Sequence, residues 1–335
     1  MDSGLTDIDT IQERVGKLPG PRDMKVIDFL DAHALRWLSL SSFCILVLRD
    51  AGAPVMTAAG GDAGFVTAQD EQHIELPLDC ADDGAVLRKG ASFGALFFLS
   101  GMTETLRVNG RVNEVTDGVA ALTVQECYLH CGKALMRSDF WSPVEAVDSA
   151  GTVEEVIQQS RLLALGTVDA NGNADVSPKG DPAGRLLHKT AHAVWYPDRP
   201  GNRRIDSFRN ILAQPQVALL ALVPGSASVL LITGEAIISD DLEQRQVFAV
   251  KDKLPTLVTR VAISHAALQQ SQALARAKLW PARPAPEGLR AADIFRDHMK
   301  LSKEKGLGAR VARAAVSVPG LLKRGLESDY EKNMY

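Results

Sequence analysis

The sequence predicts a mainly β protein, a β-barrel with flanking helices that is present twice in one chain. Two observations support this fold class. Many short apolar segments are separated by glycine-rich turns, which is typical of a small closed antiparallel barrel. The order of helix, strands and turns in the first half then begins again at about residue 151. With 335 residues, the chain is long enough for two such domains.

Residues 1–22 are expected to form a polar N-terminal arm, and residues 23–150 the first barrel. A helical stripe of apolar side chains predicts a helix over residues 24–40. A second helix is predicted from about Glu126 to Arg137. The predicted strands between these helices cover residues 43–48, 55–58, 73–78, 93–99, 105–115 and 119–124.

Residues 151–282 are expected to form the second barrel. Thr152 and Glu155 have the spacing of a capping box, which predicts the start of a helix that reaches Arg161. Residues 283–335 are predicted to be a helical tail with a solvated basic face. The predicted strands of this copy cover residues 162–168, 174–177, 192–195, 217–223 and 229–238.

Matching residues recur in the two halves at an offset that only grows along the chain. Such growth is expected if the second copy has gained residues in its loops. A tandem duplication with its boundary near residue 150 explains the ordered series. The matched pairs are Gly52 with Gly172, Gly60 with Gly180, Gly64 with Gly184, Gly110 with Gly234, Arg137 with Arg276, and Trp141 with Trp280.

Composition and charge narrow the class of protein. Hydrophobic residues make up 46% and charged residues 23%, as in ordinary globular proteins. A net charge of −4 predicts no nucleic-acid partner. No apolar run approaches the roughly 20 residues that span a bilayer, and no basic and apolar leader is present, so a cytoplasmic protein without membrane contact is expected. No metal site is expected, and reduced core thiols are predicted for Cys44, Cys80, Cys127 and Cys131.

A candidate anion site is centred on residues 196–210, which lead from a strand into a helix. A proline–glycine turn there places Arg203 and Arg204 at the start of the helix, where free N–H groups and a partial positive charge favour anions. Two solvated surface arginines are the simpler interpretation of this pair alone. Ser177 and Lys179, one strand earlier, add a hydroxyl and an ammonium donor. Together the two segments predict a phosphate site.

The first copy lacks this polar set. It has no lysine at the position that matches Lys179, and Asp82 and Asp83 stand where the second copy has its arginines. Two carboxylates at this position would repel a phosphate. The site in the first copy is therefore expected to be degenerate.

The first copy instead keeps cations that the second has lost. Arg107 has Leu231 as its counterpart. His130, Lys133 and Arg137 have the spacing of one helix face, and only the arginine of this trio persists in the second copy. Taken alone, Arg107 could equally be a charged residue on the barrel surface, and His130 could equally be a histidine of the core. The complementary losses predict one composite site that uses both copies.

These motifs resemble the pyridoxamine 5′-phosphate oxidase-like family of FMN-binding split barrels. The resemblance covers roughly residues 25–145 and 152–282, and its motifs are SPKGDPAG, PDRPGNRRIDSFRNI, SGMTETLRVNGRV and YLHCGKALMRSDFW. Family members are usually homodimers of one barrel, with FMN bound across the interface. The resemblance therefore implies two FMN-binding split barrels packed as an intramolecular pseudo-dimer.

The resemblance also implies a set of site residues. His130 is the candidate catalytic acid–base group, because the unperturbed pKa of histidine lies nearest neutrality. Neither copy holds the full family set, which predicts one FMN site for the chain. The implied cofactor-binding residues are Ser177, Lys179, Arg203, Arg204 and Ser207 from the second copy, with Arg107, Lys133, Arg137 and Trp141 from the first.

The implied function is that of an FMN-dependent oxidoreductase acting on an unidentified small molecule. NAD(P)H or O2 is the expected electron partner, and the chain is expected to be a monomeric pseudo-dimer or a homodimer of it. Oxidation of pyridoxamine phosphate itself is not favoured, because these motifs do not include the pyridoxal-phosphate pocket. The alternatives are a non-catalytic flavin-binding protein, or a barrel binding haem or a deazaflavin. Haem would need an axial ligand, for which His188 and His192 are the candidates.

Overall fold

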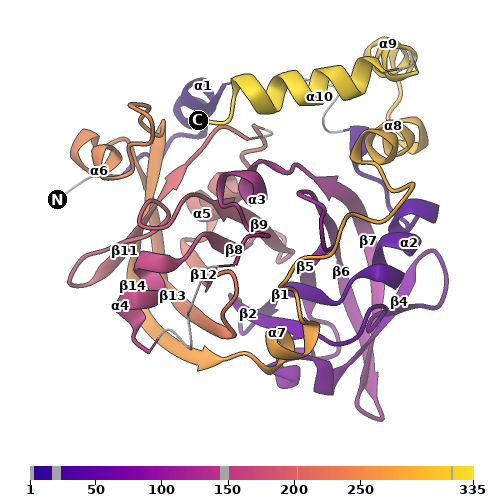
Figure 1. Ribbon diagram of the computed structural model, residues 1–335, viewed down its shortest axis with the longest axis horizontal. Helices are drawn as coiled ribbons and strands as arrows, with labels where there is room; N and C mark the ends of the chain where they lie inside the picture. The colour runs from indigo at the N-terminus through magenta and orange to yellow at the C-terminus, as the bar shows by residue number, and fades with distance from the viewer. Residues whose placement is uncertain (1–3, 17–23, 144–150, 202, 318–319) are drawn as a thin grey trace.

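Each half of the chain forms a seven-stranded antiparallel sheet within the residues that the structure describes (Figure 1). The computed structural model describes residues 4–16, 24–143, 151–201, 203–317 and 320–335. The strands of the first sheet are β1 (Phe43–Asp50), β2 (Ala53–Gly60), β3 (Thr67–Ala68), β4 (His73–Pro77), β5 (Ser92–Phe98), β6 (Thr105–Thr116) and β7 (Val119–His130). Those of the second are β8 (Leu162–Val168), β9 (Ala174–Gly180), β10 (His188–Lys189), β11 (Ala193–Asp198), β12 (Gln216–Leu222), β13 (Ser228–Ser239) and β14 (Leu257–Gln270).

The two sheets have the same topology. The first runs β2-β1-β5-β6-β7-β4-β3 and the second β9-β8-β12-β13-β14-β11-β10, so each strand has its counterpart in the same place. The register of the longest hairpin shifts at Gly110 in the first sheet and at Gly234 in the second. The mainly β fold and the tandem duplication predicted from the sequence are confirmed. The predicted boundary at residue 150 lies outside the described residues.

The two barrels pack on each other through an apolar interface. One core fills the first barrel around Trp37 and Phe97, and another fills the second around Tyr196 and Phe208. A further cluster draws side chains from both halves, including residues of β1 and β5 with residues of β8 and β12. Phe140 lies in this cluster, with its ring centroid 5.2 Å from that of Trp280 in the second half. The arrangement is an intramolecular pseudo-dimer.

Two matched glycines let the barrels approach closely. Helix α3 (Lys133–Arg137) packs on Gly180 of β9, and helix α7 (Gln272–Ala277) packs on Gly60 of β2. A Cβ atom on Gly180 would overlap the carbonyl oxygen of Ala134, and one on Gly60 would overlap that of Ala273. A larger residue would force each helix off its strand.

The matched arginines repeat this contact. Arg137 donates from Nε to the carbonyl oxygen of Gly180 at 2.9 Å, and Arg276 donates from Nε to that of Gly60 at 3.1 Å. The two halves are therefore related by an approximate twofold arrangement, in which each helix anchors on the opposite barrel.

Two predicted helices of the first barrel are shorter than expected. The helix predicted over residues 24–40 begins only at Ala32 (α2, Ala32–Leu40), because Asp31 caps it by accepting a hydrogen bond from the Ala34 amide at 2.9 Å. The helix predicted from Glu126 is wrong in its first half, since strand β7 continues to His130 by pairing with β6. His130 therefore ends a strand and shares no helix face with Lys133.

The second barrel contains one confirmed helix start and two strands that were not predicted, the two-residue β10 and the long β14. Thr152 and Glu155 form the predicted capping box of α4 (Val153–Gln159), although this helix ends before Arg161. Strand β14, the longest of the sheet, was not predicted. Helix α5 (Asp206–Ala213) ends before Pro215, which has no N–H to continue a helix, and α6 (Leu242–Val247) precedes β14.

The described residues of the predicted helical tail form three helices. They are α8 (Ala291–Leu301), α9 (Leu307–Val316) and α10 (Leu321–Lys332). Gly306 and Gly320, with φ of 120° and 76°, interrupt the predicted helix where a left-handed backbone favours glycine. Helix α10 crosses the top of the molecule in Figure 1 and brings the C-terminus beside α1 (Ile8–Val15).

The N-terminal arm packs on the second barrel. Ile11 of α1 is fully buried in the second core, and Leu5 pairs with Ile238 of β13. Its helix was not predicted from the sequence. In the described part of the chain, no helix combines the length and apolarity needed to cross a membrane.

Candidate functional site

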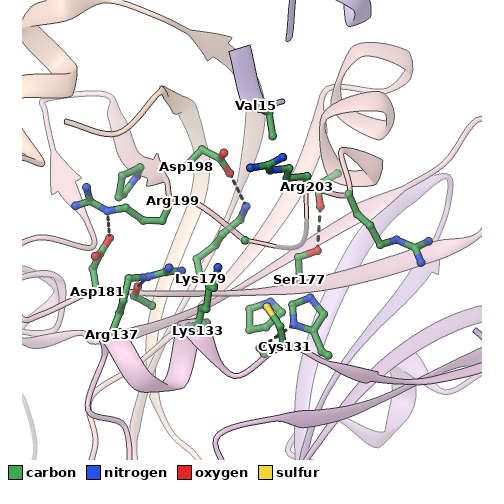
Figure 2. Close-up of a pocket in the computed structure, with 18 of the residues that line it drawn as sticks. Val15, Cys131, Lys133, Arg137, Ser177, Lys179, Asp181, Asp198, Arg199 and Arg203 are labelled. Carbon is green, nitrogen blue, oxygen red and sulfur yellow. Dashed lines mark hydrogen bonds and ion pairs between the residues drawn. The ribbon is translucent and has the colours of Figure 1, made fainter. Parts of the chain in front are cut away.

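A pocket between the barrels brings together most of the predicted site residues (Figure 2). The end of β7 and α3 form one wall, and β9 and the segment that follows β11 form the other. Val15 of α1 reaches the rim. The first barrel contributes His130, Cys131, Lys133, Ala134 and Arg137; the second contributes residues 177–181, 197–199, 201, 203, 204, 207 and 208.

The pocket is strongly cationic. Within the described lining, six cationic side chains face two carboxylates. Guanidinium and ammonium groups gathered in this way raise the local potential and favour an anion, above all a phosphate. The cations are Lys133, Arg137, Lys179, Arg199, Arg203 and Arg204, and the carboxylates are Asp181 and Asp198.

Strand β9 presents Ser177 and Lys179 to the pocket because alternate residues of a strand point to the same side. The Ser177 hydroxyl lies 3.0 Å from the hydroxyl of Ser207 at the start of α5. The Lys179 ammonium lies 3.2 Å from Asp198 and above the ring of Phe208. All of these donors line the same pocket.

The arginine pair lies just before α5 rather than in its first turn. Arg203 has a left-handed backbone with φ of 59°, which turns the chain into the pocket. Arg204 donates to Asp206 at 2.7 Å and stacks 5.3 Å from the centre of the Tyr128 ring. Tyr128 belongs to the first barrel, so Arg204 crosses between the halves. Residue 202 of this motif lies outside the described residues.

Sequence reasoning missed a buried ion pair in the lining of the pocket. Arg199 donates from Nε to Asp181 at 2.8 Å, and from Nη2 to the carbonyl oxygen of Phe248. Burial raises the pKa of Asp181, and the charge of Arg199 opposes this rise. Asp181 lies two residues after Lys179, so the alternation of β9 would have placed it near the pocket.

The first barrel supplies Lys133 and Arg137. Lys133 has only 1% of its side chain exposed, and its ammonium lies 2.9 Å from Asp329 of α10. Arg137 donates from Nη1 to the carbonyl oxygens of Pro200 and Met334. Both cations are thus in contact with the C-terminal tail or with the opposite barrel.

His130 lies at the end of β7 with its ring on the pocket. Burial, reinforced by the charges of Lys25 and Arg107, holds the pKa of His130 well below its usual range. The imidazole is therefore neutral at pH 7. It can accept a hydrogen bond, but its lowered pKa makes it a weaker proton acceptor than an ordinary histidine and leaves it without an acidic proton at neutral pH.

Two predicted ligands do not line this pocket. Arg107 is buried in an ion pair with Asp175 and stacks 5.4 Å from the centre of the Tyr128 ring, on which Arg204 also packs. It supports the wall of the pocket from behind. Trp141 donates its indole N–H to the carbonyl oxygen of Met102 and lies in the apolar interface.

A second pocket shares Arg204 with the first. Its volume is about 420 Å³, whereas the first pocket encloses only about 80 Å³. Its lining is polar and again comes from both barrels. Asn109, Gly110, Gln125 and Glu126 come from the first barrel, and Asp169, Asn173, Asp175, Asp206, Arg209 and Asn210 from the second.

The equivalent position in the first copy is filled by the chain itself. Thr57 matches Ser177, and its hydroxyl accepts a hydrogen bond from the Asp83 amide at 2.9 Å. Asp82 accepts one from the amide of Ala273 in α7 at 2.8 Å. The carboxylate predicted to repel a phosphate thus occupies the place beside α7, the counterpart of α3.

Residues 150–285 match the family described as Pyridoxamine 5′-phosphate oxidase. This match covers the second barrel, including β9 and the arginine pair. The first barrel repeats the topology of the matched barrel strand for strand. The resemblance seen in the motifs is thereby confirmed.

Similarity to solved structures covers about one barrel. HupZ of Group A Streptococcus is 16% identical over 36% of this chain and 94% of its own, with a TM-score of 0.29. General Stress Protein 26 of Bacillus anthracis is 13% identical over 36% and 92%, with a TM-score of 0.29. HutZ, the haem storage protein of Vibrio cholerae, is 15% identical over 36% and 92%, with a TM-score of 0.26. No curated protein matches the chain.

Proposed function

We propose that the chain is an FMN-dependent oxidoreductase that uses one composite flavin site between its barrels and acts on a small molecule. The observation that carries this proposal is the pocket in which six cations from both barrels surround paired hydroxyls. When bound, FMN supplies the hydride or electron transfer, while the protein binds and orients it.

The donor set fits a phosphate monoester. Both carboxylates of the lining already have cationic partners, Asp181 with Arg199 and Asp198 with Lys179, so they add little repulsion. The hydroxyls of Ser177 and Ser207 bond to each other and can both turn to donate to an anion.

The residues that would bind the phosphate come from both barrels. Arg203 and Arg204 would hold the phosphate from the second barrel, and Lys133 and Arg137 would close on it from the first. Neutral His130 would accept a hydrogen bond at the edge of the site. The second pocket, about 420 Å³, supports a separate position for a small substrate beside Arg204.

A non-catalytic flavin-binding protein is the second candidate. The first pocket, about 80 Å³, is far below the roughly 300–1,000 Å³ of typical ligand pockets, so it offers no space for a substrate beside a bound phosphate group. The haem alternative loses its sequence-based candidates, because neither His188 nor His192 is among the lining residues of the first pocket. The His188 ring instead packs edge-on against Phe248.

The visible spectrum of the purified chain tests the proposal. Flavin absorption bands, regained on adding FMN to stripped protein, are expected. Bleaching of these bands by NADH or NADPH would support an oxidoreductase, and bands that neither nucleotide bleaches would favour a flavin carrier. A Soret band, or failure to take up FMN, would overturn the FMN assignment.

A further inference from the structure

The end of the C-terminal tail lies on the cationic pocket. Asp329 forms the ion pair with Lys133, and the carbonyl oxygen of Met334 accepts from Arg137 at 3.0 Å. The Tyr335 ring packs on the guanidinium of Arg199, with 5.4 Å from Cζ to the ring centre. Three of the six cations of the lining are thus in contact with residues 329–335.

Tyr330 fixes this end of α10 to the first barrel. Its hydroxyl accepts from the amide of Gly132, directly before Lys133, at 3.1 Å and donates to Glu104 at 3.1 Å. Burial raises the pKa of Glu104, and burial together with Glu104 raises the pKa of Tyr330 well above its usual range. Tyr330 therefore keeps its proton at neutral pH, and its two hydrogen bonds hold α10 beside the pocket.

The tail contacts both first-barrel cations, Lys133 and Arg137, directly. Lys133 is almost fully buried, and Asp329 holds its ammonium. The free volume of about 80 Å³ admits a small anion but not a whole flavin. A phosphate-bearing ligand that uses both Lys133 and Arg137 must displace Asp329 and the Met334 carbonyl.

We propose that residues 329–335 are a tethered competitor for the phosphate group of the ligand. The segment occupies Lys133, Arg137 and Arg199 and is released when a phosphate-bearing ligand binds. This inference rests on the proposed flavin site and adds a built-in control of its affinity. If the segment leaves the cations free for only a fraction of the time, the apparent Kd for the ligand equals the intrinsic Kd divided by that fraction. For a site that is free about a tenth of the time, removal of the segment is expected to tighten binding about tenfold.

The test measures FMN affinity, by quenching of flavin fluorescence, for four proteins. They are the full chain, a chain that ends at Ser328, the variant Asp329→Asn and the control Glu331→Gln, which alters an exposed carboxylate on the same helix. The shortened chain should bind about tenfold tighter, Asp329→Asn should lie between it and the full chain, and the control should be unchanged. Equal FMN affinity in all four would overturn the proposal.

Amide hydrogen exchange in the full chain gives an independent measurement. Exchange in residues 329–335 should accelerate on adding FMN or inorganic phosphate, but not sodium chloride at matched ionic strength. Acceleration by phosphate without FMN binding would support the competitor and reject the flavin site. FMN binding with the tail still protected would reject the competitor and leave the flavin site standing. Tail exchange that neither FMN nor phosphate accelerates would overturn the competitor.

Discussion

At the scale of single residues, the candidate site combines polar groups that are separated in sequence but joined by Tyr128. Arg204 packs on one side of this ring, and Arg107 packs within 5.4 Å of its centre. The sequence predicted both arginines as ligands, yet only Arg204 lines the pocket. The sequence pattern could not distinguish a structural role for Arg107 from a ligand-binding role. Its partner Asp175 belongs to the other barrel, and only the packed interface brings the two residues together.

Loss of the arginine pair should empty the site. Arg203 is exposed and Arg204 half-buried, and a bound phosphate would cover both. Removing one partner of a charged hydrogen-bonded pair that is buried in this way typically costs about 2–5 kcal/mol, so Arg203→Ala with Arg204→Ala should give folded, colourless protein. The matched control is Lys189→Ala, which breaks an exposed pair with Glu154 in the same barrel and should leave FMN affinity unchanged. FMN titration decides it, and wild-type affinity in the double variant would place the phosphate elsewhere.

The depressed pKa of His130 predicts a loss of stability in mild acid. Unfolded histidine titrates near about 6.5, whereas the folded imidazole stays neutral to a lower pH, so only the unfolded chain gains this proton as pH falls below about 6.5. The stabilisation is fully present above that pH. His130→Gln should remove this contribution, which amounts to at most about 1.4 kcal/mol per pH unit.

Urea unfolding of both proteins between pH 7.5 and 5 measures the difference. The free energy of unfolding should fall more steeply with falling pH in the wild type than in His130→Gln. Parallel curves would mean that His130 titrates alike in the folded and unfolded chain.

At the scale of elements, strands with glycine turns were predictable and the transitions between strand and helix were not. His130, Lys133 and Arg137 have the spacing of one helix face, but pairing of residues 126–130 with the neighbouring strand outweighs that local signal. Strand β14 was missed for the same reason. Its burial depends on β13 and β11, which no local pattern reveals.

The close approach of α3 to β9 gives a prediction with an internal control. Gly180→Ala and Gly60→Ala introduce the same overlap at matched positions, against the carbonyls of Ala134 and Ala273. Each should destabilise the fold by about 1–3 kcal/mol. Only Gly180→Ala should also weaken FMN binding, because α3 and Gly180 line the cationic pocket.

Thermal unfolding and FMN titration, the latter at a temperature where both variants are folded, separate the two effects. Equal loss of FMN affinity in Gly60→Ala and Gly180→Ala would contradict a single site on the α3 side.

At the scale of the whole molecule, the ordered repeats in the sequence were enough to predict two barrels, and most of the predicted site residues line a pocket between them. The contribution of the tail was not predictable, since its basic side chains suggested a solvated face. The contact with the pocket is made instead by Asp329, Met334 and Tyr335, whose positions depend on how three helices fold back over the barrels.

The duplication itself makes the last prediction, a stoichiometry of one FMN per chain. In a homodimer of one barrel, twofold symmetry gives two equal sites, but here Asp82 caps α7 and Thr57 is held by the Asp83 amide at the second position. Flavin released from saturated protein should therefore approach one mole per mole of chain.

Because that single ligand contacts both barrels, free FMN at 100 times its Kd should add about 2.7 kcal/mol to the free energy of unfolding. A Lys133→Ala or Lys179→Ala variant should need more FMN for the same rise in Tm, whereas Gln272→Ala, at the counterpart of Lys133, should behave as wild type. Two moles of flavin per chain, or an effect of Gln272→Ala equal to that of Lys133→Ala, would mean that both positions bind.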